Sequence, residues 1–219
     1  MPLYQVWQQL SDEFDKLVPE FETFAVAKSS SISAADFDLV EECTLEGLLS
    51  RSWQAWCNFC RSCVIDSCLG TTDGNGAPVP AHPSAHTEQH VSGAWLEAKK
   101  KSKNPWGPTN AILRLEPTWG DTDTLVSSLP RMDPTNKAQL LAAFSSAHPQ
   151  AKILQLIRNA AAHNNPETMA SVTSEASKYI AFSPKHPLHA LFWLSPVSKD
   201  YLVLTAIEEL RDAALTAIS

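Results

Sequence analysis

Residues 156 to 165 read LIRNAAAHNN and bring an arginine, an asparagine and a histidine together near the end of an apolar segment. With about 3.6 residues per helical turn, Asn159 and His163 share one face of a helix, and Arg158 lies roughly 100° away at its edge. A guanidinium offers paired donors to phosphate oxygens, and an imidazole can serve as acid or base near neutral pH. These three residues are therefore a candidate site for chemistry on a phosphate.

The same residues also have a purely structural interpretation. A histidine at a helix C-terminus is stabilised as a cation by about 0.3–1 kcal/mol, because the helix dipole is negative there. The context favours a site, since small alanines separate the polar groups and leave room for a large ligand to approach the helix.

The elements around this motif place it at a corner between two helices. The segment HPQAKILQLIRNAAAHN has the apolar spacing of an amphipathic helix. Asn165 is a favourable N-cap for the segment that follows, because Pro166 then takes the first helical position. We therefore expect His163 in the last turn of one helix, directly before the next helix begins.

Helical spacing of apolar residues recurs toward both ends of the chain. Residues 3–27 form one predicted helix, which Pro19 either kinks or splits. Ser33 is the predicted N-cap of a second helix, which runs to about residue 69 and spans about 50 Å. The segment SKDYLVLTAIEELRDAALTAI is predicted to close the chain as a helix.

The chain is thus predicted to be all-α, a single domain over residues 1–219 built as one helical bundle. Residues 70–110 interrupt the bundle as a loop-rich insertion, since GTTDGNGAPVPAHPSAH carries turn signals throughout, with one short helix at SGAWLEAKKK. For the segments around 111–119 and 187–194, the sequence does not decide between one or two short strands and irregular links. DTDTLVSSLP is expected to form one or two helical turns.

A second candidate site is a cluster of cations beside two aromatic side chains in AWLEAKKKSKNPWGP. Lysines that contact phosphates and tryptophans that stack on bases are the means by which proteins hold single-stranded nucleic acid. The alternative is a solvated charge run on a loop, which is commoner. The residues concerned are Lys99, Lys100, Lys101 and Lys103, with Trp95 and Trp106.

Two further groups have spacings that resemble metal ligands. Four cysteines read C-x2-C-x2-C-x4-C, similar to iron–sulfur ligands, but they fall inside a predicted helix and spread around its surface, so we expect core packing and no metal or cofactor. Three histidines at steps of four lie beside Pro83, which favours solvated loop positions over a metal-binding helix. These residues are Cys57, Cys60, Cys63, Cys68, His82, His86 and His90.

Composition limits the class of protein. The 219 residues are 44% hydrophobic and 19% charged, which is ample for a buried core. A net charge of −7 argues against non-specific coating of DNA but permits a local basic site, because salt screens distant charges. Acids near the first residue leave no export signal, no apolar run of about 20 residues spans a bilayer, and an odd number of cysteines suits a reducing compartment. We therefore expect a cytoplasmic protein without a membrane partner.

The candidate motif resembles the R-x4-6-H motif of the HEPN superfamily (higher eukaryotes and prokaryotes nucleotide-binding), with Arg158, Asn159 and His163 at its polar positions. An asparagine often follows the arginine in that family. The mainly helical layout is also similar, with the motif on a late helix and a long aromatic-rich helix before it. The motif covers six residues, the likeness of the bundle covers most of the chain loosely, and residues 70–110 match nothing in the family core.

This resemblance implies a metal-independent endoribonuclease of the toxin or phage-defence type, which acts as a homodimer because two motifs face each other across the interface. It implies that His163 handles the proton of the ribose 2′-OH or of the leaving 5′-oxygen, that Arg158 stabilises transition-state charge, and that Asn159 orients the phosphate. The products would be a 2′,3′-cyclic phosphate and a 5′-OH. An antitoxin or sensor partner is also implied, although antitoxin-paired members often carry tyrosine where this chain has Asn165.

Three hypotheses follow from the sequence. The first is a dimeric, all-α ribonuclease whose site is Arg158, Asn159 and His163. The second is a non-catalytic helical module, in which Arg158 and His163 contact a nucleotide or RNA or hold a dimer together. The third is a metal or iron–sulfur protein built on the cysteines.

Overall fold

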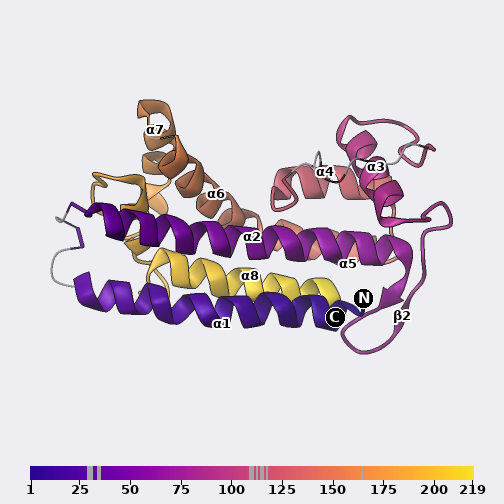
Figure 1. Cartoon of the computed structure of the whole chain (residues 1–219), viewed down its shortest axis with the longest axis horizontal. Helices are drawn as coiled ribbons and strands as arrows, with labels where there is room; N and C mark the ends of the chain where they lie inside the picture. The colour runs from indigo at the N-terminus through magenta and orange to yellow at the C-terminus, as the bar shows by residue number, and fades with distance from the viewer. Residues whose placement is uncertain are drawn as a thin grey trace. The chain divides into compact units, whose positions relative to one another are not determined.

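The computed structural model describes residues 1–28, 32–33, 36–108, 111, 113, 116, 118–163 and 165–219. The chain is mainly α-helical, which confirms the predicted fold class (Figure 1). The α-helices are α1 (Leu3–Lys28), α2 (Leu39–Leu69), α3 (Glu88–Lys99), α4 (Thr122–Met132), α5 (Lys137–Ser146), α6 (His148–Ala162), α7 (Pro166–Ser174) and α8 (Leu202–Ile218). The shorter elements are strands β1 (Thr71–Thr72) and β2 (Pro78–Val79) and the 3-10 helices η2 (Ala176–Lys178) and η3 (Pro187–Phe192). None of the described helices combines the length and apolar character needed to cross a membrane.

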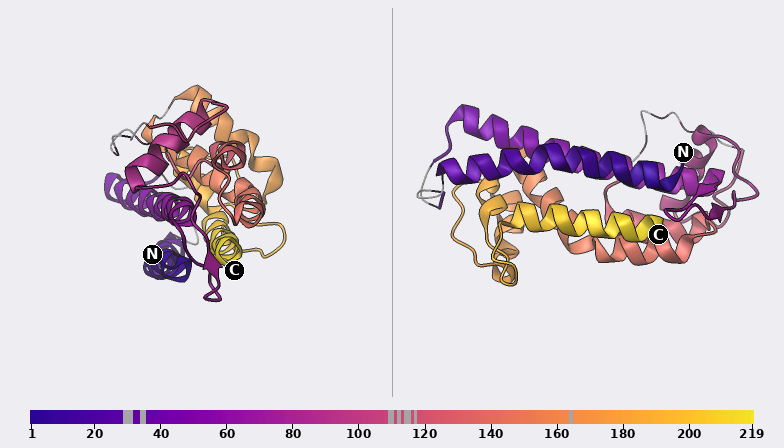
Figure 2. Two further views of the ribbon diagram at one scale, coloured as in Figure 1. Left: turned by 90° about the vertical axis from the view of Figure 1, so that its right-hand side faces the viewer. Right: turned by 90° about the horizontal axis from the view of Figure 1, so that it is seen from below.

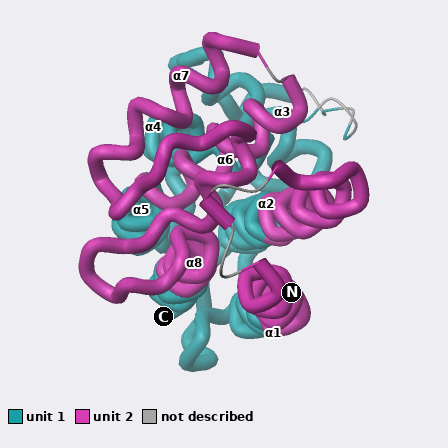
Figure 3. Tube along the Cα trace, turned by 90° about the vertical axis from the view of Figure 1, so that its left-hand side faces the viewer, with its two compact units in different colours: residues 1–11, 56–148, 211–219 teal, residues 12–55, 149–210 magenta. Residues whose placement is uncertain are grey.

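The chain divides into two compact units, each assembled from segments that are distant in sequence (Figure 3). Unit 1 contains residues 1–11, 56–148 and 211–219, and unit 2 contains residues 12–55 and 149–210. Helices α1, α2 and α8 each contribute one part to unit 1 and another to unit 2. Apart from His148, α6 belongs to unit 2, so the candidate motif lies there, whereas the lysine stretch lies in unit 1.

Helix α1 passes through Pro19 without splitting, and Figure 2 shows it as one continuous helix. A proline inside a helix costs about 3 kcal/mol, because it removes a backbone hydrogen bond and crowds the preceding turn. In unit 2, the apolar face of α1 offsets this cost, since Phe14, Leu17 and Phe21 are all buried.

Helix α2 begins at Leu39, so the prediction that Ser33 is its N-cap is wrong. Asp38 caps the helix instead. Its Oδ1 accepts a hydrogen bond of 2.9 Å from the Glu41 N–H, and the Glu41 carboxylate accepts one of 3.0 Å from the Asp38 N–H. This reciprocal pair is a capping box, which satisfies two backbone donors at the start of the helix.

Unit 1 is organised around aromatic side chains. Trp95 of α3 stacks on Trp119, with ring centroids 4.6 Å apart and planes inclined by 20°. Trp56 of α2 packs edge-on against Phe144 of α5 and donates a hydrogen bond of 3.2 Å to the Gly120 carbonyl. Helix α4 lies beside both α3 and α5, so the predicted insertion contributes to the core of this unit.

A short hairpin opens the region predicted as a loop-rich insertion. Strands β1 and β2 pair antiparallel, with Thr71 opposite Val79. The Asp73 side chain accepts hydrogen bonds from two backbone N–H groups within the turn, at 2.9 and 2.8 Å. Gly76 takes a φ of +83° there, a conformation that costs glycine little.

Helix α3 is longer than the short helix predicted in this region. It begins at Glu88, four residues before the predicted segment, because the Thr87 hydroxyl accepts a hydrogen bond of 3.2 Å from the His90 N–H and caps it. His90 therefore lies on a helix, and it is buried. The expectation of a solvated loop histidine is wrong at this position.

Unit 2 contains a buried 3-10 helix, η3, in the segment for which the sequence allowed either a strand or an irregular link. All six residues of η3 are buried, and Phe192 stacks on Phe24 of α1 with ring centroids 5.6 Å apart. The chain then makes single β-bridges, in which Leu194 pairs with Ile180 and with Tyr201. The apolar run LHALFWL is thus a core segment without becoming a strand.

The remaining segments differ from expectation mainly in length. Helix α4 has 11 residues rather than one or two turns, since the Asp121 carboxylate accepts hydrogen bonds from the Asp123 and Thr124 N–H groups and caps it. Helix α7 is short and ends at Ser174. The open choice at residues 111–119 falls partly outside the described residues, because positions 112, 114, 115 and 117 are not among them.

Candidate active site

The candidate motif lies on the last turns of α6, which is fixed in unit 2 by its apolar face. Ile153, Leu154, Ile157 and Ala160 are buried, and they recur at the spacing of one side of a helix. Polar residues that fall between them must face away from this core. The sequence therefore dictates that the motif is presented at the surface of the helix.

The structure brings Arg158 and Asn159 together. Arg158 is exposed and Asn159 is half-buried. The Arg158 Nη1 donates to the Asn159 Oδ1 at 3.5 Å, at the outer limit for a hydrogen bond. Within the described part of the chain Arg158 forms no ion pair, which leaves its other donors available for an anion.

His163 is the first residue after α6, and it continues the helical hydrogen bonding by donating its N–H to the Asn159 carbonyl at 3.0 Å. Its imidazole is exposed and makes no hydrogen bond to any residue that the structure describes. The predicted capping of α7 by Asn165, with Pro166 at the first helical position, is confirmed. His163 therefore lies at the corner between two helices, as expected.

Arg158 also lines a small surface pocket together with residues of α2. No local sequence pattern indicates these α2 residues, because they lie more than 100 positions from Arg158. The pocket has a volume of about 70 Å³ and is lined by Glu46, Leu49, Ser50, Arg158, Ala161 and Ala162. A carboxylate and a hydroxyl therefore share this pocket with the guanidinium, and the alanines keep the α6 side of it open.

The lysine stretch forms an exposed set of cations at the end of α3. Lys99, Lys101 and Lys103 are exposed and form no ion pair with described residues, whereas Lys100 pairs with Glu97 at 2.8 Å. Lys101 has a φ of +64°, in the left-handed region where glycine is usual. Three unpaired cations within five residues are a suitable contact for phosphates.

The two tryptophans of that stretch have different environments. Trp95 is fully buried against Trp119, so the prediction that it stacks on RNA bases is wrong. Trp106 is half-buried, stacks on His82 with centroids 4.3 Å apart, and donates to the Met132 carbonyl at 3.2 Å. Of the two indoles, only that of Trp106 has exposed surface for a base.

The motif and the lysine stretch belong to different compact units, and we treat them as separate features. The structure brings Arg158, Asn159 and His163 onto one helix end. It groups the four lysines around the end of another helix.

The cysteines pack as core side chains, as predicted. Cys57, Cys60, Cys63 and Cys68 are buried, and their sulfur atoms are thiols. Burial raises the pKa of Cys68 to about 12 and raises the pKa of Cys60 and Cys63 as well, so these thiols stay neutral. Among the described residues no group of three or more histidine, cysteine or acidic side chains is arranged to hold a metal ion.

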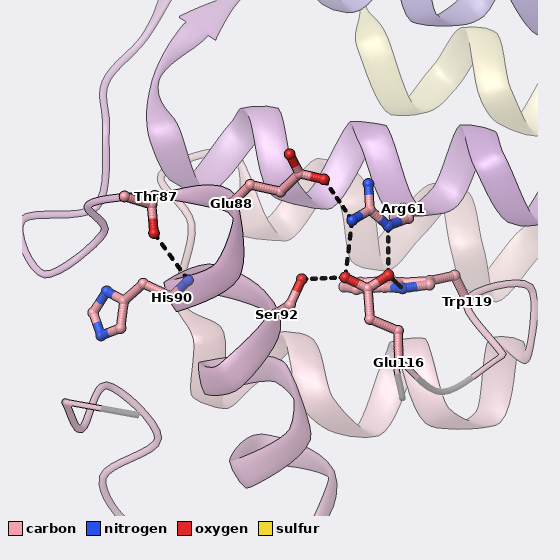
Figure 4. A network of polar contacts seen from close by, with 7 residues as sticks. All are labelled: Arg61, Thr87, Glu88, His90, Ser92, Glu116 and Trp119. Carbon is pink, nitrogen blue, oxygen red and sulfur yellow. Dashed lines mark hydrogen bonds and ion pairs between the residues drawn. The ribbon is translucent and has the colours of Figure 1, made fainter. Parts of the chain in front are cut away.

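A polar network in unit 1 links α2, α3 and the segment before α4 (Figure 4). Arg61 pairs with Glu116 and Glu88, and Glu116 also accepts hydrogen bonds from Ser92 and from the Trp119 Nε1. Burial alone would raise the pKa of Glu116, but the hydrogen bonds from Arg61, Ser92 and Trp119 lower it overall. Each charged group has a partner within the network, so we assign the network to structure.

No protein-family model matches the chain, and no similar protein was found among the curated proteins or the solved structures. The resemblance to the HEPN superfamily therefore depends on the residues of α6 and on the mainly helical fold.

Proposed function

We propose that this protein is a metal-independent endoribonuclease of the HEPN type, with its site at the end of α6. The observation that carries the proposal is that an arginine and a histidine, five residues apart, are both exposed where α6 meets α7. Exposed, unpaired catalytic groups at a surface suit a polymeric substrate, which cannot enter a deep cavity.

The chemistry is a transesterification within RNA. The ribose 2′-oxygen attacks the adjacent phosphorus while the bond from phosphorus to the 5′-oxygen breaks, leaving a 2′,3′-cyclic phosphate and a 5′-OH. A base must take the 2′-OH proton and an acid must protonate the 5′-oxygen. His163 serves one of these roles, Arg158 stabilises charge on the phosphate oxygens, and Asn159 orients the phosphate.

One chain supplies a single histidine at this site, so the second proton-transfer group must come from elsewhere. In our proposal a symmetric homodimer provides it, because a two-fold axis brings the same residue from each copy to one place. We place the protein in the cytoplasm, in a toxin or phage-defence role with an antitoxin or sensor partner. The exposed lysines at the end of α3 support RNA as the substrate, since they offer a sequence-independent phosphate contact.

A second function is favoured by one observation, the carboxylate of Glu46 in the pocket beside Arg158. A carboxylate next to the guanidinium weakens its attraction for a phosphate. This arrangement favours a non-catalytic binding module, in which Arg158 and His163 contact a second copy of the chain and hold a dimer together.

The test is cleavage of total cellular RNA in the presence of EDTA by the wild type, His163→Ala and Arg158→Ala. His86→Ala serves as the matched control, because His86 is also an exposed histidine but lies in unit 1. We expect wild type and control to produce fragments ending in 2′,3′-cyclic phosphate, and each motif variant to lose activity by roughly 100-fold or more. Cleavage by His163→Ala at the wild-type rate would reject the catalytic assignment. Intact RNA with a folded, dimeric wild type would favour the binding module.

A further inference from the structure

The main chain of His163 is held from both sides, although its side chain makes no hydrogen bond to the residues that the structure describes. Its N–H donates to the Asn159 carbonyl at 3.0 Å. Its carbonyl accepts a hydrogen bond of 2.7 Å from the Asn165 Nδ2. The Thr168 hydroxyl lies 3.4 Å from the same carbonyl but is nearer to the Asn165 carbonyl, at 3.0 Å. The last carbonyls of a helix have no partner within the helix, and water usually satisfies them at a surface. At His163 the Asn165 side chain takes that place.

The side chain of Asn165 makes hydrogen bonds both to the start of α7 and to the end of α6. Its Oδ1 accepts hydrogen bonds of 3.0 Å from the Glu167 and Thr168 N–H groups, which caps α7. Its Nδ2 reaches back to His163, at the end of α6. Its own N–H donates to the Thr168 hydroxyl at 3.3 Å, completing a capping box. The residue that starts α7 therefore also fixes the position where α6 stops.

This arrangement fixes the place on the main chain from which the imidazole of His163 projects. The direction of the bond from Cα to Cβ follows from the main chain, and the exposed imidazole has no hydrogen-bonding partner among the described residues. If the carbonyl of His163 were free, the residue after the last helical position could rotate its peptide and move the imidazole. A displacement of about 1 Å is enough to cost a catalytic group up to roughly 100-fold in rate.

We propose that Asn165 is a positioning residue for His163, acting through the hydrogen bond from its Nδ2 to the His163 carbonyl. This inference rests on the proposed ribonuclease function. Asn165 itself does not contact the phosphate, because its oxygen is occupied by the backbone of α7 and its amide group binds the His163 carbonyl. The asparagine two positions after the histidine thus serves as a donor as well as a cap.

The test separates the donor from the cap. Asn165→Asp and Asn165→Ser both keep a good N-cap acceptor, and neither carries an amide donor. Serine adds no charge, so it separates loss of the donor from the effect of a new carboxylate. Asp121→Asn makes the reverse exchange at the N-cap of α4, in unit 1, and controls for exchanging amide and carboxylate at a cap. Steady-state cleavage of an RNA oligonucleotide and thermal unfolding are measured for each.

We expect both Asn165 variants to lose kcat by roughly 10- to 100-fold with little change in KM, while the melting temperature stays close to that of the wild type. Asp121→Asn should keep the wild-type kcat. Wild-type kcat in both Asn165 variants would overturn the inference, and the proposed function would still stand if His163→Ala were inactive.

A second measurement does not depend on activity. NMR signals of the His163 imidazole and amide report the mobility and environment of that residue directly. We expect broadened or shifted His163 signals in both Asn165 variants, with the Glu167 and Thr168 amides still protected from hydrogen exchange. Unchanged His163 signals would overturn the positioning role. If the wild type cleaves no RNA, the proposed function fails, and these signals alone decide whether Asn165 positions His163.

Discussion

Arg61 binds both carboxylate oxygens of Glu116. Its Nε donates to Oε2 at 2.5 Å, and its Nη2 donates to Oε1 at 2.8 Å. The same arginine also reaches Glu88 at 2.6 Å, so one side chain of α2 holds α3 and the segment before α4 in place. Paired donors in a rigid plane make this contact geometrically specific, which a lysine would not reproduce.

Replacing Glu116 by glutamine should destabilise the protein in a pH-dependent way. The pKa of Glu116 is below its ordinary value of 4.5, so its charged form adds stability above that value, and the stability is lost as pH falls through the folded pKa. We expect Glu116→Gln to lower the free energy of unfolding at pH 7 by about 1.5–3 kcal/mol, with a smaller difference in acid. Urea unfolding at several pH values measures this. Glu13→Gln, at the exposed pair with Arg51, should cost less than about 1 kcal/mol.

The start of α2 provides a second prediction. Asp38→Ala removes the acceptor of the capping box and should lower the free energy of unfolding by about 1 kcal/mol. Ser33→Ala should have little effect, since α2 begins well after that residue. Thermal unfolding of the two variants side by side is the measurement. A larger loss in Ser33→Ala than in Asp38→Ala would contradict the assigned cap.

The two tryptophans beside the lysines should respond oppositely to substitution. Trp95→Ala should cost about 3–5 kcal/mol of stability, because it removes a buried ring stacked on Trp119. Trp106→Ala should unfold at a temperature nearer the wild type but bind single-stranded RNA more weakly by roughly 1 kcal/mol, through a lost stacking surface. Thermal unfolding and a fluorescence titration distinguish them. Unchanged RNA affinity in Trp106→Ala would limit its indole to a structural role.

The exposed lysines should set part of the salt dependence of RNA binding. Neutralising Lys99 and Lys103 together by glutamine should lower the slope of log affinity against log salt by about 1.4, as expected for two phosphate contacts on a single strand. The matched control neutralises Lys16 and Lys178. Both are exposed, and each forms an ion pair with the glutamate three residues before it. Equal slopes for the two double variants would mean that the lysines at the end of α3 are solvated only.

Alkaline pH should weaken the protein through its buried thiols. The pKa of Cys68 is raised by burial from 9.0 to about 12, so its neutral form adds stability that is full below 9.0 and is lost as pH rises toward 12. We expect the free energy of unfolding to fall over this range, and to fall less steeply in Cys68→Ala. In the folded protein, iodoacetamide should modify only Cys43, the exposed cysteine. Rapid modification of the other four at neutral pH would contradict their burial.

The fold class could be predicted because apolar residues along the long helices repeat at the helical period. In α6, Ile153, Leu154 and Ile157 mark the buried face without reference to any other part of the chain. The cap at Asn165 was equally local, since an asparagine before a proline determines it. Arg158, Asn159 and His163 could be placed at one helix end for the same reason, because all three lie within six residues of one another.

The sequence did not decide between two nearby residues that could each cap the start of α2. Ser33 has an acid at its third position, Asp36, and Asp38 has Glu41 at the same spacing, so both resemble caps. Only the hydrogen bonds between Asp38 and Glu41 show which one starts α2. Residue type alone does not rank an aspartate above a serine at this position.

Contacts between residues that are distant in the chain could not be predicted from the sequence. The burial of Trp95 depends on Trp119, which lies 24 residues away across a turn-rich segment. The pocket beside Arg158 depends on Glu46 and Ser50, which are on another helix. No periodic pattern in a single sequence indicates which helices lie against each other.

Unit 1 is discontinuous, and this affects how the chain is made in the cell. It needs residues 1–11 and residues 211–219, and within it Gln139 of α5 donates to the Thr216 carbonyl of α8 at 3.0 Å. A ribosome adds about 5–20 residues each second. For several seconds after their synthesis, residues 56–148 therefore lack the packing partners that residues 211–219 supply, and their apolar side chains stay exposed. A nascent chain of this kind is a natural client for chaperones, and a messenger cut short before codon 211 would yield a product prone to aggregation.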